Sequence, residues 1–164
     1  MKTVGVLLMG YWLTAIAIGA QGNSEVPIDV KAEIRREGKS NIILYTTLKN
    51  SSSNSITLWN VDLPWGHFRN MIVVVVPLSQ PTPLKEWFSP SNPIWEEVTL
   101  KSGESTSGEV RLSHKFPNLG RALSRTNVLL FWSYQANTVD EKVLVRQGGQ
   151  LIIPKNANKS ATTK

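Results

Sequence analysis

The sequence predicts an all-β domain, an antiparallel β-sandwich of about eight or nine strands with one short connecting helix. Short segments of alternating or β-branched apolar residues recur along the chain, and clusters of Gly, Asn, Ser and Pro separate them. Sheets that are apolar on one face must cover one another, which favours two stacked sheets. A closed barrel is the second choice.

Side chains alternate between two faces in each of the first three predicted strands, and the first strand has one charged face. Apolar residues such as Ile28 and Val30 alternate with charged residues such as Lys31, which is the pattern of a half-buried strand. The third strand places Trp59 in the expected core. The three strands lie at 28–35, 42–49 and 56–63, with turns at 37–40 and 50–54.

The second half of the chain is more apolar. Met71 to Val76 is an uninterrupted, β-branched run, which predicts a central strand covered on both faces, and 128–135 belongs near a sheet centre for the same reason. The helical spacing of Phe116, Leu119 and Leu123 predicts the short connecting helix. Further strands are expected at 94–100, 108–113, 142–147 and 151–154, the last two joined by a Gly148-Gly149 hairpin turn.

The first twenty residues predict export. Lys2 precedes an apolar run from Val4 to Ile18, and small residues follow at Gly19 and Ala20, as in a signal peptide. The run is too short for a membrane span. We therefore expect a signal peptide at 1–20, a β-sandwich domain at 26–154, a disordered polar tail at 155–164, and a mature protein that is periplasmic or secreted without a stable membrane span.

Composition excludes several classes of site. The chain has no cysteine, so it holds no disulfide, thiol nucleophile or thiolate metal site. The net charge of +6 includes one lysine of the leader, and the remaining basic residues are spread along the chain. Nucleic-acid binding requires a dense basic face, so no nucleic-acid partner is expected. We expect a monomer.

No residues form a catalytic or metal-binding pattern. The two histidines, His67 and His114, have no partner at ligand spacing. Ser113 and His114 are adjacent on an expected strand, where neighbours point to opposite faces, so they would not meet as nucleophile and base. The sequence predicts no metal, no cofactor and no enzymatic activity.

The candidate binding residues are aromatic and lie in two loops. Exposed aromatic rings offer a large, rigid contact area to a protein or to a sugar ring. In the alternative interpretation these rings fold back and cap the open ends of the sandwich. The candidates are Trp65, His67 and Phe68 in one loop, and Trp87 and Phe88 in the proline-rich loop 79–93.

Two segments carry a resemblance to known proteins. LKNSSSNSITLW at 48–59 ends one strand in Asn-x-Ser before the next begins, and VTLKSGES at 98–105 is a strand-turn element with Gly-Glu at its apex. With these segments the chain resembles exported bacterial immunoglobulin-like domains, which implies an immunoglobulin-like sandwich. The same segments are similar to the bacterial intracellular proteinase inhibitor family, which implies inhibition of a proteinase.

These observations favour an exported, non-enzymatic binding domain with a protein or glycan partner. One alternative is a secreted proteinase inhibitor that presents the proline-stiffened loop 79–93 to a protease cleft. A second alternative is a carbohydrate-binding accessory module that uses the loop tryptophans.

Overall fold

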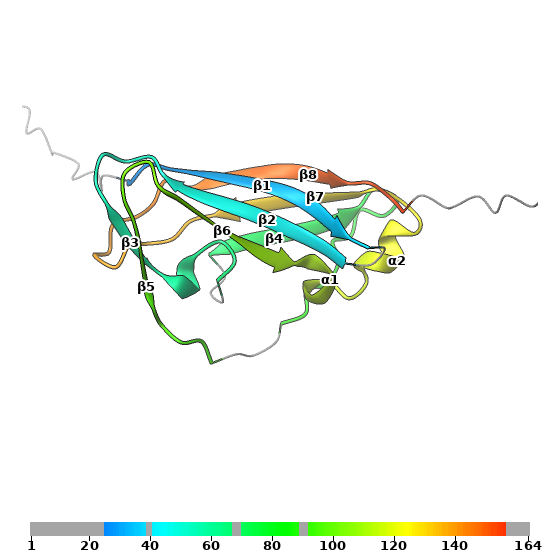
Figure 1. Ribbon diagram of the computed structural model, residues 1–164. Coiled ribbons are helices and arrows are strands. Elements are labelled where there is room, and N and C mark those ends of the chain that lie inside the picture. Colours follow the sequence, from blue (N-terminus) through cyan, green and yellow to red (C-terminus); the bar gives the residue numbers. More distant parts are fainter. Residues whose placement is uncertain (1–24, 39–40, 67–69, 89–91, 157–164) are drawn as a thin grey trace, which may run out of the picture.

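The computed structural model describes residues 25–38, 41–66, 70–88 and 92–156 (Figure 1). The expected signal peptide at 1–20 lies outside the described residues. So do two of the candidate binding residues, His67 and Phe68, and the expected tail from residue 157 onward.

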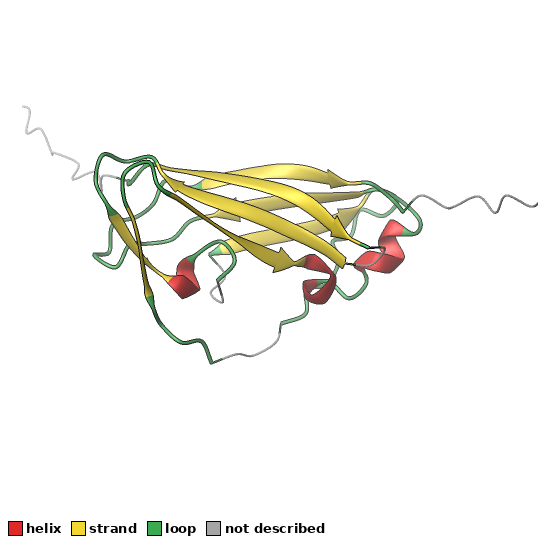
Figure 2. Ribbon diagram, in the orientation of Figure 1, coloured by secondary structure: helices red, strands yellow, loops and turns green. Residues whose placement is uncertain are grey.

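The described chain is mostly antiparallel β-structure, as predicted (Figure 2). Its eight strands form three sheets, ordered β1-β2-β6, β3-β5 and β4-β7-β8. Two short helices and one 3-10 turn connect them. The elements are β1 (Ile28–Glu37), β2 (Asn41–Asn50), β3 (Ile56–Trp59), η1 (Asn60–Asp62), β4 (Met71–Pro77), β5 (Glu97–Leu100), β6 (Ser105–Arg111), α1 (Leu112–Lys115), α2 (Leu119–Leu123), β7 (Val128–Tyr134) and β8 (Gln147–Ile153).

The two three-stranded sheets share one hydrophobic core (Figure 1). The side chains that β1 and β2 direct into this core follow the predicted alternation. Ile28 and Val30 of β1 and Leu44 and Leu48 of β2 are buried. The opposite sheet contributes Met71, Val73 and Val75 from β4, Val128, Leu130 and Tyr134 from β7, and Ile153 from β8.

The β2–β6 ladder continues into the β3–β5 ribbon through two adjacent turns. Asn50 ends β2 and is fully buried. Its Nδ2 donates to the carbonyls of Asn54 at 2.7 Å and Leu100 at 3.0 Å, and its Oδ1 accepts from the Ser52 N–H at 2.9 Å. This one side chain therefore joins the turn that follows β2 to the end of β5.

The predicted hairpin at Gly148-Gly149 is wrong. Both glycines lie inside β8, where Gly149 is the register partner of Trp132. A Cβ on Gly149 would lie 3.1 Å from the Trp132 Nε1, and a Cβ on Gly148 would lie 3.0 Å from the Trp132 carbonyl oxygen. The two glycines therefore allow Trp132 of β7 to approach β8 closely, and close approach of a neighbour is a common reason for glycine within a strand.

Strand β4 is not a central strand covered on both faces. It lies at the edge of its sheet, while β7 holds the central position predicted for it. Ile72 is 55% exposed and Val74 is 37% exposed, and they share the outer face with Phe131 and Ile152. A fully apolar run indicates a buried strand only when a second layer covers the far face, and none of the described segments covers this one.

Several element boundaries also differ from the predictions. The strand expected at 94–100 is four residues long, and the strand expected at 108–113 ends at Arg111, where α1 begins. In the segment expected as a strand at 142–147, Val143 and Leu144 form isolated bridges, and Gln147 already belongs to β8. Lys155 and Asn156, which the sequence assigned to the tail, donate backbone N–H groups to Asn127 Oδ1 and to the Leu123 carbonyl, each at 2.8 Å.

Candidate binding cleft

A cleft of about 490 Å³ opens between the edges of the two large sheets. The outer edge of β6 borders it on one side and the outer edge of β4 on the other. A volume of this size is within the range of ligand sites in proteins. Its lining comes from five segments: Pro64, Trp65 and Gly66; Met71 and Val73; Glu86, Trp87 and Phe88; Glu109, Val110 and Arg111; and His114 and Lys115.

Trp65 forms the inner wall of the cleft. Its ring is partly buried and packs against the core. It lies directly under β6, because a Cβ added to Gly108 would be 2.2 Å from the indole ring. Because Gly108 has no side chain, the Trp65 indole has room to lie between the sheets.

Three residues hold the loop that carries Trp65. The Tyr134 hydroxyl of β7 donates to the Asp62 carbonyl at 3.0 Å, and the Asn70 Nδ2 donates to Asp62 Oδ1 at 2.7 Å. Burial raises the pKa of Asp62, and the hydrogen bond from Asn70 opposes this shift. Burial, together with the nearby Asp62 carboxylate, raises the pKa of Tyr134, so the phenol stays protonated and keeps its donor.

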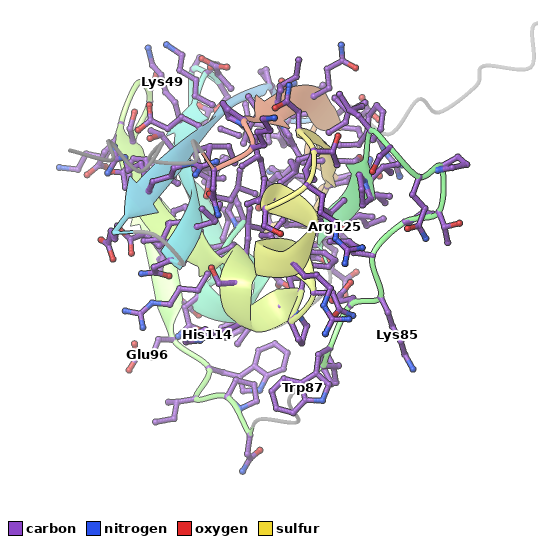
Figure 3. The ribbon with its side chains drawn as sticks, turned by 90° about the vertical axis from the view of Figure 1, so that its right-hand side faces the viewer. Lys49, Lys85, Trp87, Glu96, His114 and Arg125 are labelled. Carbon is purple, nitrogen blue, oxygen red and sulfur yellow. The ribbon has the colours of Figure 1, made fainter. Side chains whose placement is uncertain are left out.

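Trp87 and Phe88 form the exposed side of the cleft. Trp87 is 64% exposed and Phe88 is 53% exposed. The backbone before them is fixed at two points, since the Leu84 N–H donates to the Val75 carbonyl and the Trp87 N–H donates to the Lys115 carbonyl, each at 2.8 Å. Figure 3 shows Trp87 projecting from the body of the molecule beside α1.

One ion pair fastens the same segment to α1. The Lys115 Nζ lies 3.2 Å from the Glu86 Oε1, and both side chains are partly buried. Together with the Trp87 N–H bond to the same lysine's carbonyl, the pair positions the proline-rich loop against the helix. The backbone that carries the Trp87 and Phe88 rings is therefore held in place by α1.

The structure brings together three of the five predicted binding residues. Trp65, Trp87 and Phe88 line one cleft although they come from two separate loops. Trp65 packs against the core, as the capping interpretation expects, whereas Trp87 and Phe88 are exposed. His67 and Phe68 lie outside the described residues.

The sequence did not assign the cleft residues of β6 and α1 to a binding site. In the sequence, Glu109, Val110 and Arg111 show only the alternation of an ordinary strand. Their position beside the aromatic loops follows from the sheet order. Ser113 and His114 lie on α1 rather than on the predicted strand. The Ser113 Oγ accepts the Ile42 N–H at 2.7 Å, and His114 lines the cleft.

Two further exposed apolar side chains lie beyond the cleft, just before β5. Ile94 is 77% exposed and Trp95 is 52% exposed. Trp59, predicted in the core, is half-buried and meets Trp95 edge-on, with ring centroids 5.8 Å apart. The apolar surface therefore extends past the cleft along the chain that leads to β5.

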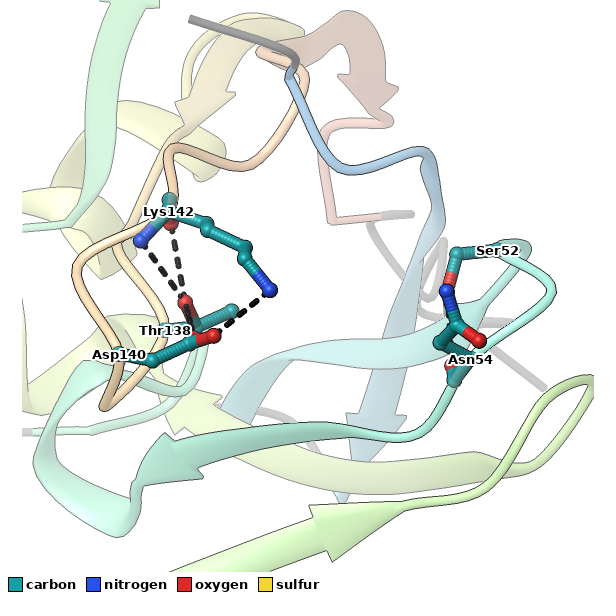
Figure 4. A network of polar contacts seen from close by, with 5 residues as sticks. All are labelled: Ser52, Asn54, Thr138, Asp140 and Lys142. Atoms are coloured by element: carbon teal, nitrogen blue, oxygen red, sulfur yellow. Dashed lines mark hydrogen bonds and ion pairs between the residues drawn. The ribbon is translucent and has the colours of Figure 1, made fainter.

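A second depression, of about 330 Å³, is polar and lies between the turn at 51–55 and the loop at 138–142 (Figure 4). The Lys142 Nζ lies 2.7 Å from Asp140 Oδ2, and the Lys142 N–H donates to Thr138 Oγ1 at 3.0 Å. Hydrogen bonds from Lys142 and Thr138 lower the pKa of Asp140. These groups bond to one another, so the network shapes the loop.

No protein-family model matches the chain, and no curated protein matches it. Over the described residues, no three His, Cys, Asp or Glu side chains are grouped as metal ligands would be. Among the helices that the structure describes, none has the length and apolar character needed to cross a membrane.

Proposed function

We propose that this chain is an exported, non-enzymatic binding domain that holds its partner in the cleft between β4 and β6. The observation that carries the proposal is the convergence of Trp65, Trp87 and Phe88 from two separate loops on one cleft. Tryptophan and other aromatic residues are enriched where binding energy is concentrated. The export component rests on the sequence of residues 1–20.

We also propose that the sandwich is immunoglobulin-like. In immunoglobulin domains, strands A, B and E share one sheet and strands C, F and G share the other. The orders β1-β2-β6 and β4-β7-β8 are consistent with this partition, with β4 in the place of strand C and β6 in the place of strand E. The β3–β5 ribbon is then an addition beside the two sheets.

The test is capture of a partner from the envelope fraction of the native cells by the full-length chain. The double variant Trp87→Ala with Phe88→Ala removes the exposed rings, and we expect it to lose the captured partner. The matched control is Ile72→Thr with Ile152→Thr, which removes exposed apolar side chains from a different face. Equal capture by both variants would contradict the proposal.

A proteinase inhibitor is the second candidate. The observation that favours it is that Trp87, Phe88, Ile94 and Trp95 are all exposed in the described parts of the segment between β4 and β5 (Figure 1). Stoichiometric inhibition of a protease in a panel would support this candidate, and cleavage of the segment without inhibition would oppose it. A glycan-array signal that disappears with Trp87→Ala would instead support a carbohydrate-binding module.

A further inference from the structure

Within the part of the chain that the structure describes, the outer edge of β6 has free backbone hydrogen-bonding groups. The Asn50 N–H donates to the Glu104 carbonyl at 2.9 Å, which sets the phase of the β2–β6 ladder. In an antiparallel ladder, alternate residues direct their N–H and C=O groups to opposite sides. Ser105, Ser107, Glu109 and Arg111 therefore direct theirs away from β2, and among the described residues no backbone hydrogen bond reaches these groups from another segment.

The side chains at the cleft end of β6 alternate between charged and apolar. Glu109 and Arg111 are exposed on the outer face, whereas Val110 is half-buried and packs against the core. Within the described part of the chain, neither charged side chain forms an ion pair. One free acid and one free base thus lie two residues apart on the same face of an open strand edge.

We propose that the cleft binds an extended peptide that adds to the sheet as a strand antiparallel to β6. This inference rests on the proposed function of the cleft and names the chemistry of its partner. Each paired strand of the described structure is antiparallel to its neighbour, so the added strand continues the same arrangement. Strand addition at a sheet edge gives affinity through the main chain and specificity through alternate side chains.

The charges of the β6 side chains and the faces on which they lie determine the preferred peptide sequence. Antiparallel pairing places consecutive peptide residues opposite Arg111, Val110 and Glu109, in that order. Opposite charges favour an acidic residue across from Arg111 and a basic residue across from Glu109. The middle residue faces inward, as Val110 does, toward Trp65 and Met71, so it is apolar. The preferred motif reads acidic, apolar, basic from the amino to the carboxyl end.

Backbone methylation of the peptide tests the strand pairing directly. Residues opposite Glu109 and Arg111 direct their N–H groups to β6, whereas the N–H of the middle residue points away. We use fluorescein-labelled Ser-Glu-Leu-Lys-Ser and measure anisotropy with the full-length chain. N-methylation of the lysine should weaken binding about tenfold or more, and N-methylation of the leucine should change it less than about twofold.

A charge exchange on the protein provides the matched test of register. The wild-type chain should bind Ser-Glu-Leu-Lys-Ser more tightly than the reversed peptide Ser-Lys-Leu-Glu-Ser. The double variant Glu109→Lys with Arg111→Glu alters two exposed side chains and leaves the ladder groups of β6 in place. It should invert the preference, and an unchanged preference would overturn the proposed pairing.

The two proposals fail in different ways. If no peptide binds, or if both N-methylated peptides bind alike, strand addition is wrong. The cleft remains the binding site in that case as long as Trp87→Ala with Phe88→Ala abolishes capture of the native partner. If capture survives that variant, the proposed function itself is wrong, whatever the peptides show. A glycan-array signal in place of peptide binding would also overturn strand addition.

Discussion

Replacing Gly108 by Ala tests the position of Trp65, on which the cleft depends. The added Cβ would lie 2.2 to 2.4 Å from three atoms of the indole ring. Carbon atoms in ordinary contact are about 3.5 Å apart or more, so the ring must move by about 1 Å or leave the gap between the sheets. Overpacking of this kind costs about 1–3 kcal/mol of unfolding free energy.

A double-mutant cycle separates this contact from other effects of the substitution. In a Trp65→Ala background the space is empty, and Gly108→Ala should stabilise the strand by about 0.5–1 kcal/mol because alanine loses less backbone entropy than glycine. The difference between the two effects is a coupling between the sites of about 1.5–4 kcal/mol. Urea unfolding followed by circular dichroism measures each of the four proteins.

The matched control is Gly120→Ala in α2. A Cβ on Gly120 meets no heavy atom within 4 Å, so the same substitution should stabilise the protein by up to about 1 kcal/mol. If Gly108→Ala and Trp65→Ala prove additive, the indole does not lie under β6, and the described shape of the cleft is wrong.

Three further predictions concern the loop that carries Trp65 and the outer face of β4. Tyr134→Phe removes the hydrogen bond to the Asp62 carbonyl and should lower the unfolding free energy by about 1 kcal/mol in urea titrations, whereas an unchanged value would show that the bond is absent in solution. Because burial raises the pKa of Asp62 above its ordinary 3.8, the wild type should lose stability relative to Asp62→Asn as the pH rises from about 3.8 through the raised pKa, and a constant difference would contradict the shift. The pair Ile72→Thr and Ile152→Thr should change stability by less than about 0.5 kcal/mol, because both side chains are exposed, and a large loss would mean that a further part of the molecule covers this face.

The local pattern of the sequence predicted most of the strands. Alternation identified β1 and β2 and assigned Ile28, Val30, Leu44 and Leu48 to one side of a sheet, because period-two burial is a property of each strand by itself. The short helix α2 was predicted for a similar reason, since its apolar residues recur at helical spacing.

The wrong predictions concern features that depend on residues distant in the sequence. The Gly148-Gly149 pair satisfies a turn rule, but Trp132 on the adjacent strand requires the glycines within β8. The apolar run of β4 has the composition of a covered strand, but the described structure leaves Ile72 exposed. Neither result can be read from a local window of sequence.

The sequence predicted only the part of the candidate site that a local pattern can show. Loop aromatics are recognisable in a sequence, so the sequence alone predicts Trp65, Trp87 and Phe88 as binding residues. Glu109 and Arg111 gain significance from the position of β6 at the edge of its sheet, which is a property of the topology. At an open edge, their alternation with Val110 indicates which side chains an added strand would prefer. In a central strand the same three residues would indicate no such preference, because both edges are already paired.

Hydrogen exchange of single backbone amides in the unliganded, full-length chain tests the open edge beside the cleft most directly. We predict slow exchange at Gly108 and Val110, whose N–H groups bond to β2, and fast exchange at Glu109 and Arg111, whose N–H groups point outward. Equal protection of all four amides would mean that another segment already occupies the edge, and it would contradict the binding cleft described above.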